Sequence, residues 1–162
     1  MKTVAFLLFL TALSACARVV TTSTNSNPPP TPKVSPSQVV SDFLEALKRR
    51  DFGTTYDYVS AGYAANLDKE NYKTNMNQAL QKFGWNLLNY QILGVQILGD
   101  QAVVVAEQEI QVKTLGSNKE TQKKINVQYG LSVIDKKWKI FGSSCISNCL
   151  SREDFTGQGL NQ

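Results

Sequence analysis

The chain of 162 residues contains no histidine. It therefore lacks the usual proton acceptor of catalysis at neutral pH, the commonest metal ligand and the central residue of a Ser-His-Asp triad. Its cysteines and acidic residues do not follow the spacing of metal ligands, and it has no glycine-rich phosphate loop. We therefore expect no metal site and no cofactor.

Long hydrophobic runs are also missing, apart from one near the start. Residues 4–13 form a mostly apolar stretch that follows the positively charged start Met1-Lys2-Thr3. The stretch is too short to span a bilayer, which needs about 20 apolar residues. A positive start followed by a short apolar segment is typical of a secretory signal peptide, so the protein is expected to be exported.

This apolar stretch ends in Leu13-Ser14-Ala15-Cys16. The four residues resemble the lipobox of bacterial lipoproteins, in which an aliphatic residue and two small residues precede a cysteine. The resemblance implies that residues 1–15 are a signal peptide and that Cys16 carries a diacylglyceryl group. An ordinary secretory leader with an unmodified cysteine is the alternative. We therefore expect a lipid anchor at Cys16, on a membrane facing the periplasm or the cell exterior. Ala17 after the cysteine favours the outer membrane if the host has one.

Cysteine is scarce, with Cys16, Cys145 and Cys149 as the three members. An odd number in an exported protein needs an explanation, and lipid on Cys16 would leave one pair. Two thiols are too few for a structural metal site, and a redox centre normally has two intervening residues rather than three. We therefore expect a disulfide between Cys145 and Cys149, formed across a bent loop. Because the closed loop is short, it should contribute only about 2 kcal/mol.

Negative charge is in a slight minority, since 17 lysines and arginines face 13 acidic residues. The basic residues lie in short groups at 48–50, 123–124 and 136–139, and aromatic residues do not alternate with them along a stripe. This pattern argues against a nucleic-acid partner. It favours solubility and a mild attraction to anionic lipid.

Residues 16–35 hold the lipidated cysteine and a segment of low complexity. Serine, threonine and asparagine dominate residues 21–27, and four prolines follow in residues 28–32. The segment has too few apolar side chains to offset the entropy of ordering it. It could serve as a proline-rich ligand for a partner domain, but a spacer between lipid and domain is the commoner role, and we favour it.

Three helices are expected next. Ser35, Asp51 and Asp68 are each placed to cap a helix start, and Pro36 suits the first position of the first helix. Apolar residues recur at helical spacing after each cap, and Gly84 ends the third helix. The third helix carries an apolar face made of Tyr72, Met76, Ala79, Leu80 and Phe83.

The pattern then changes to the alternation of β-strands. Leu88, Tyr90 and Ile92 share one side of the first strand, and the parity reverses beyond Gly94, which indicates a β-bulge. Further strands are expected over 102–113, 124–133 and 138–143. The sequence therefore predicts an α+β domain of three N-terminal helices packed on a curved four-stranded antiparallel sheet.

This arrangement resembles the nuclear transport factor two-like, or cystatin-like, superfamily. The likeness is carried by residues 39–47 (VVSDFLEAL), by Asp51-Phe52 leading into Tyr56, and by residues 135–140 (DKKWKI). It covers about residues 36–144. The resemblance implies a cone-shaped domain with a pocket between sheet and helices. We assign the domain to residues 36–149 and a disordered tail to residues 150–162.

Five residues are candidates for lining such a pocket, and they combine carboxylates with tyrosines. None of them matches a catalytic motif of the superfamily, so no catalytic residue is assigned. Tyrosines at core spacing are usually core residues, and alternating Glu107, Glu109 and Gln111 also suit an exposed polar sheet face. The candidates are Tyr56, Asp57, Tyr90, Glu107 and Tyr129.

Two functions remain open. The domain is either a non-enzymatic module that binds an envelope protein or a small apolar ligand, or an isomerase- or dehydratase-like enzyme that uses a carboxylate and a tyrosine. We favour the first. Burial of Asp57 or Glu107 beside a pocket would support the second, and exposure of both would leave the first.

Overall fold

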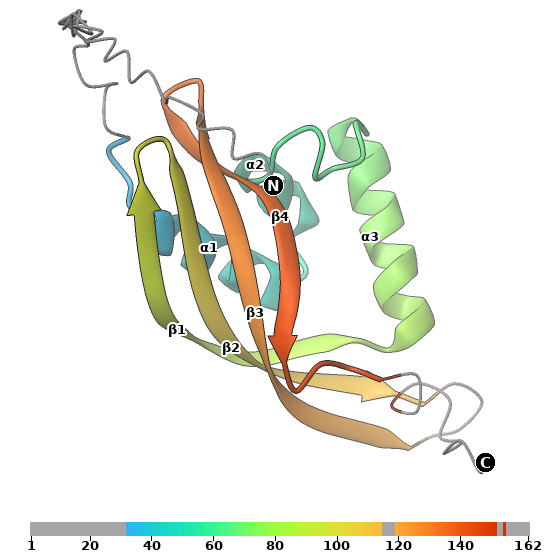
Figure 1. Cartoon of the computed structure of the whole chain (residues 1–162). Coiled ribbons are helices and arrows are strands. Elements are labelled where there is room, and N and C mark those ends of the chain that lie inside the picture. The colour runs from blue at the N-terminus through green and yellow to red at the C-terminus, as the bar shows by residue number, and fades with distance from the viewer. Residues whose placement is uncertain (1–31, 115–118, 152–153, 155–162) are drawn as a thin grey trace, which may run out of the picture.

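A computed structural model describes residues 32–114, 119–151 and 154. Its elements follow the chain as α1 (Pro36–Lys48), α2 (Phe52–Tyr58), α3 (Lys69–Phe83), β1 (Asn86–Leu98), β2 (Gln101–Lys113), β3 (Glu120–Ile134) and β4 (Lys137–Ser147). The strands form one antiparallel sheet in the order β1-β2-β3-β4. Figure 1 shows the long strands bending together, with the helices on one side of the sheet. The predicted α+β class and element order are confirmed.

The predicted leader, the lipobox with Cys16 and most of the tether lie outside the described residues. Among the described helices, none combines the length and the apolar character needed to cross a membrane.

The three helix starts are capped as predicted. The side chains of Ser35, Asp51 and Asp68 each accept a hydrogen bond from the backbone N–H three residues later, at 3.2, 3.0 and 2.8 Å. Each bond satisfies an N–H that has no partner within its helix. The caps therefore fix where the helices begin, which sets how α1 and α3 meet the sheet.

The core lies between α1 and the inner face of the sheet. Val40 and Leu44 of α1 are fully buried, as are Val104 of β2, Leu131 of β3 and Ile140 of β4. The clean alternation predicted for β2 and β3 places these side chains on one face. These side chains form the packed part of the core between α1 and the sheet.

Strand β1 contains two irregularities, of which the sequence predicted one. The register shifts between Ile92 and Gly94, as the reversed parity indicated, and shifts again between Leu87 and Asn89. Leu88 has no residue opposite it, and the buried Leu87 takes the inward place. The two bulges bend β1 strongly, because each adds local twist.

The two edges of the sheet differ. At the β4 edge, Val59 forms a short parallel bridge to Ile140, and the Ser60 N–H donates to the Ile140 carbonyl at 2.8 Å. The residues after α2 thus extend the sheet on that side. Strand β1 forms the opposite edge.

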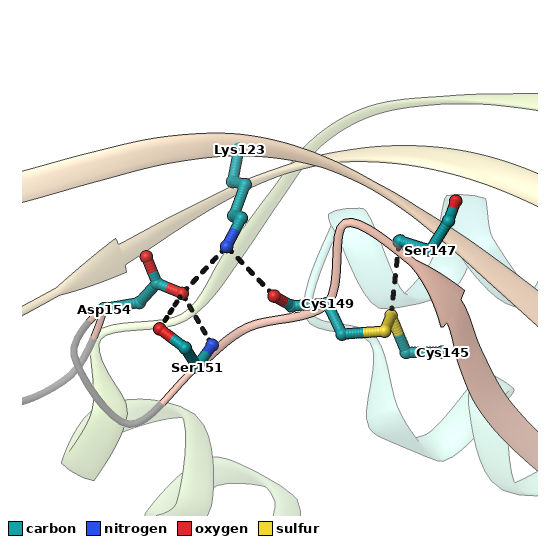
Figure 2. The surroundings of a disulfide bond; sticks show 6 residues. All are labelled: Lys123, Cys145, Ser147, Cys149, Ser151 and Asp154. Carbon is teal, nitrogen blue, oxygen red and sulfur yellow. Dashed lines mark hydrogen bonds and ion pairs between the residues drawn. A yellow bond between two sulfur atoms is a disulfide. The ribbon is translucent and has the colours of Figure 1, made fainter.

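At the C-terminal end of β4, Cys145 and Cys149 are joined by a disulfide with their α-carbons 5.7 Å apart (Figure 2). Asn148 between them has a φ of 54°, in the left-handed region. This backbone reversal is the bent loop that the four-residue spacing required, since asparagine tolerates the left-handed region better than most residues.

Three residues of the expected tail, Leu150, Ser151 and Asp154, belong to the described part of the chain, and two of them contact the domain. Leu150 packs against the core, and Asp154 forms an ion pair with Lys123 at 3.0 Å. The Lys123 ammonium also donates to the Cys149 carbonyl at 2.9 Å, as Figure 2 shows. Hydrogen bonds from Ser151 are the largest cause that lowers the pKa of Asp154. The chain is therefore held to β3 just beyond the disulfide.

Candidate ligand-binding cavity

A cavity of about 400 Å³ lies between α3 and the inner face of the sheet, at the end where β4 finishes. Its walls combine aliphatic and aromatic side chains with a few neutral polar groups. Lysine, arginine, aspartate and glutamate do not line it. The lining residues are Phe43, Leu47, Tyr63, Tyr72, Met76, Ala79, Leu80, Phe83, Trp85, Gln108, Ile125, Val127, Tyr129, Ser143, Ser144 and Cys145.

One wall of the cavity is the apolar face predicted for α3. In α3 only Tyr72 is buried; Met76 and Leu80 are half-buried and Phe83 is exposed. Tyr72 anchors the helix, because its ring packs edge-on against Tyr56 of α2 with centroids 5.4 Å apart. Beyond this anchor the helix stands away from the curved sheet. The apolar face therefore borders a cavity instead of closing on the core.

The end of α3 sets the position of Trp85 in the cavity wall. Gly84 has a φ of +55°, and the following Trp85 N–H donates to the Leu80 carbonyl at 3.2 Å. Such a bond satisfies one of the last free carbonyls of a helix and turns the chain sharply. The turn brings the half-buried Trp85 ring to the cavity before β1 begins.

The polar centre of the cavity is a pair of neighbouring side chains on β2 and β3. The Gln108 amide Nε2 donates to the Tyr129 Oη at 2.6 Å, and the two residues are 3 % and 4 % exposed. Burial is the main cause that raises the pKa of Tyr129 far above its usual value, so the phenol stays protonated. Among the described residues, none accepts a hydrogen bond from its hydroxyl proton. That proton can therefore be donated to a ligand atom.

Two further hydroxyl contacts involve residues of the wall. Tyr63 Oη and Ser143 Oγ are 3.0 Å apart, which ties the loop before α3 to β4. The Thr55 hydroxyl lies 3.5 Å from Tyr72 Oη, and burial raises the pKa of Tyr72. The polar groups of the wall are thus neutral hydrogen-bonding groups without formal charge.

The two carboxylates proposed from the sequence lie elsewhere. Asp57 is exposed on α2 and pairs with the Lys69 ammonium at 2.8 Å. Glu107 is half-exposed on the outer face of the sheet, where Lys124 pairs with it at 3.4 Å. Neither belongs to the cavity wall. No described group of three or more cysteine or acidic side chains could hold a metal ion.

Of the three tyrosines proposed from the sequence, only Tyr129 lines the cavity. The Tyr56 hydroxyl donates to the Leu67 carbonyl at 3.0 Å, and the Tyr90 hydroxyl donates to the Ser41 carbonyl at 3.1 Å. These two rings pack on the core with their hydroxyls bonded to backbone. The five candidates are therefore not brought together at one site.

The residue that sequence reasoning missed is Gln108. Its signal was present in the alternation of β2, where the inward positions run Ala102, Val104, Ala106, Gln108, Ile110 and Val112. One polar residue within such an apolar register must find a buried partner. That partner is Tyr129, which faces the same side of the neighbouring strand.

We expect Tyr129→Phe to lower the free energy of unfolding by about 1–3 kcal/mol, because the buried Gln108 amide loses its acceptor. The double variant Tyr129→Phe with Gln108→Leu should recover part of this loss, since both polar groups are then removed together. Urea unfolding of the two single variants and the double variant measures the coupling. Strictly additive losses would contradict a direct bond between the two side chains.

The sequence matches no protein-family model and no curated protein. Its fold is similar to solved structures at low sequence identity. A ketosteroid isomerase-like protein from Erwinia carotovora atroseptica is 15% identical with a TM-score of 0.53, over 68% of this chain and 93% of that one. A SEC-C motif containing protein from Rhodopseudomonas palustris is 13% identical with a TM-score of 0.52, over 70% and 80%. An NTF2-like protein from Cytophaga hutchinsonii is 16% identical with a TM-score of 0.48, over 66% and 90%. The first two likenesses show a similar fold alone.

Proposed function

We propose that the domain is a non-enzymatic module that binds a small apolar ligand in the cavity, and that lipid on Cys16 holds it at the cell envelope. The observation that carries the binding role is the cavity beside α3, whose uncharged walls surround the buried Gln108–Tyr129 pair. A pocket with mostly apolar walls and a few fixed polar groups is the usual form of a small-molecule site.

The ligand should be largely apolar and carry one hydrogen-bond acceptor, such as a carbonyl or ether oxygen. Tyr129 lines the cavity and keeps its hydroxyl proton, which it can donate to a ligand atom in a hydrogen bond. A charged ligand would lose its hydration in this uncharged wall without gaining a counter-charge, which is unfavourable. The wall therefore selects for neutral molecules.

The enzymatic alternative needs a proton acceptor next to the bound ligand. The sequence contains no histidine, and the two candidate carboxylates, Asp57 and Glu107, stand outside the cavity wall in ion pairs with lysines. General base catalysis requires hydrogen-bonding reach to the substrate proton. These positions favour binding over turnover.

The binding role can be tested with the neutral fluorophore N-phenyl-1-naphthylamine, titrated against the full chain. We expect Ala79→Phe to weaken binding at least tenfold, because residue 79 lines the cavity and the larger ring would fill part of it. Gln78→Phe is the matched control, since the neighbouring exposed residue does not line the cavity. Equal binding by both variants, with helix content unchanged, would refute the cavity as the site.

A further inference from the structure

One end of the domain combines exposed apolar and basic side chains. The described chain begins here at Pro32, and the two-residue turns between β1 and β2 and between β3 and β4 meet here, as the upper part of Figure 1 shows. The Val133 N–H donates to the Asp100 carbonyl at 2.9 Å, which joins the turns. We call residues 33–34, 97–100 and 134–137 together the tether-side end.

Large apolar side chains are concentrated at the tether-side end. Nine such side chains are exposed in the described part of the chain, and four of them, Val34, Ile97, Leu98 and Ile134, lie here. Leu98 is the most exposed of the nine, at 65 %. Ile97 and Leu98 run directly into the β1–β2 turn, and Ile134 stands at the start of the β3–β4 turn. A group of exposed apolar side chains marks a surface that binds a membrane or a protein.

Basic side chains lie beside these apolar residues. Lys33, Lys136 and Lys137 line one groove next to the first described residues, and all three are exposed. Within residues 33–34, 97–100 and 134–137 the acidic residues are Asp100 and Asp135, so lysines are in excess by one. The groove is also lined by Lys139, Asp42 and Asp57. Apolar side chains bordered by lysines are the pattern of segments that rest in the headgroup region of anionic membranes.

The length of chain between Cys16 and the first described residue also favours a membrane contact at this end. Cys16 precedes Pro32 by 16 residues, so a fully extended chain places the anchor at most about 60 Å from this end. A weak surface contact is strengthened by such tethering, because binding becomes intramolecular. The cavity wall residues Phe83 and Cys145 lie toward the opposite end, where α3 and β4 finish.

We propose that the tether-side end docks on the headgroup region of an anionic membrane and leaves the cavity facing the aqueous compartment. This inference rests on the lipid anchor of the proposed function. Val34, Ile97, Leu98 and Ile134 enter the interface, while Lys33, Lys136 and Lys137 contact lipid phosphates. Docking fixes the orientation of the domain, so that ligand enters from the side away from the bilayer.

The test places a tryptophan at either end of the full lipidated chain, reconstituted in phosphatidylcholine vesicles that contain phosphatidylglycerol and brominated acyl chains. Leu98→Trp reports the tether-side end. Ile146→Trp, at a position that is 51 % exposed, reports the opposite end. The signal of the two native tryptophans, measured in the unsubstituted chain, is subtracted. We expect bromine to quench the tryptophan at position 98 at least twofold more than the one at position 146.

Adding Lys33→Glu and Lys137→Glu should reduce this difference while flotation of the chain with the vesicles is unchanged.

The outcomes separate the two proposals. Flotation with equal quenching at the two positions would overturn the docking while leaving the anchor intact. A chain that fails to float would overturn the anchor, and the docking that depends on it.

Discussion

Replacing Cys16 with serine is expected to release the protein from membranes almost completely. Two acyl chains on Cys16 would bury roughly 30 methylenes at about 0.8 kcal/mol each, which makes the anchor effectively permanent. The docking proposed for the tether-side end is far too weak to replace it. Fractionation of cells with an alkaline wash measures the change, and mass spectrometry of the extracted wild-type protein should show an acylated N-terminal cysteine.

The matched control for this prediction removes the other two cysteines. Cys145→Ser with Cys149→Ser should leave membrane attachment unchanged, because the disulfide stands in the folded domain and closes only a short loop. A Cys16→Ser chain that remains tightly on membranes after the wash would mean that another feature of the protein anchors it.

Local signals in the sequence were enough to predict most of the fold. The helix starts at Ser35, Asp51 and Asp68 depend on a side-chain oxygen and a nearby N–H, so a few neighbouring residues decide them. The bulge before Gly94 changed the parity of the apolar positions, which makes it visible. The bulge at Leu88 was missed because Leu87 and Leu88 are both leucine, and alternation cannot show which of them faces inward.

The cavity could not be predicted in the same way. The apolar face of α3 has the pattern of a helix packed on a core, and local spacing does not tell whether the sheet bends toward it or away. The space between α3 and the sheet depends on how the bulged β1 curves and on where the chain turns after Gly84. Both depend on contacts between segments that are far apart in the sequence. The polar centre was easier to find in principle, because Gln108 interrupts an apolar inward register that can be counted along β2.

Asp57 and Glu107 were predicted to line one pocket, and their absence from the cavity wall has a related cause. Both residues have the chemistry of acid–base catalysts, but the register of the sheet places Glu107 opposite Asn126 on the outer face. Its neighbour Gln108 faces inward instead. A shift of one residue along a strand exchanges the two faces, so residue type alone cannot decide which of two neighbours reaches the cavity.

Replacing Gly84 with alanine is expected to lower the free energy of unfolding by about 2–5 kcal/mol. A left-handed backbone costs an L-residue roughly 1–2 kcal/mol. A Cβ at position 84 would also stand 2.4 Å from the Lys113 Cβ and 3.3 Å from the Lys113 backbone nitrogen. The root of a side chain and the backbone cannot swing away, so overpacking should add about 1–3 kcal/mol. Urea unfolding measures the total.

Gly99→Ala is the matched control for this last prediction. Gly99 also has a positive φ, of 63°, but no heavy atom lies within 4 Å of the Cβ that alanine would add. This variant should lose only the backbone cost of roughly 1–2 kcal/mol, so the difference between the two variants isolates the contact of α3 with β2. Because Gly84 also directs Trp85 into the cavity wall, Gly84→Ala should weaken binding of N-phenyl-1-naphthylamine, whereas Gly99→Ala should not. Equal losses of stability in the two variants would show that the turn after α3 yields without strain, and would contradict its role in shaping the cavity.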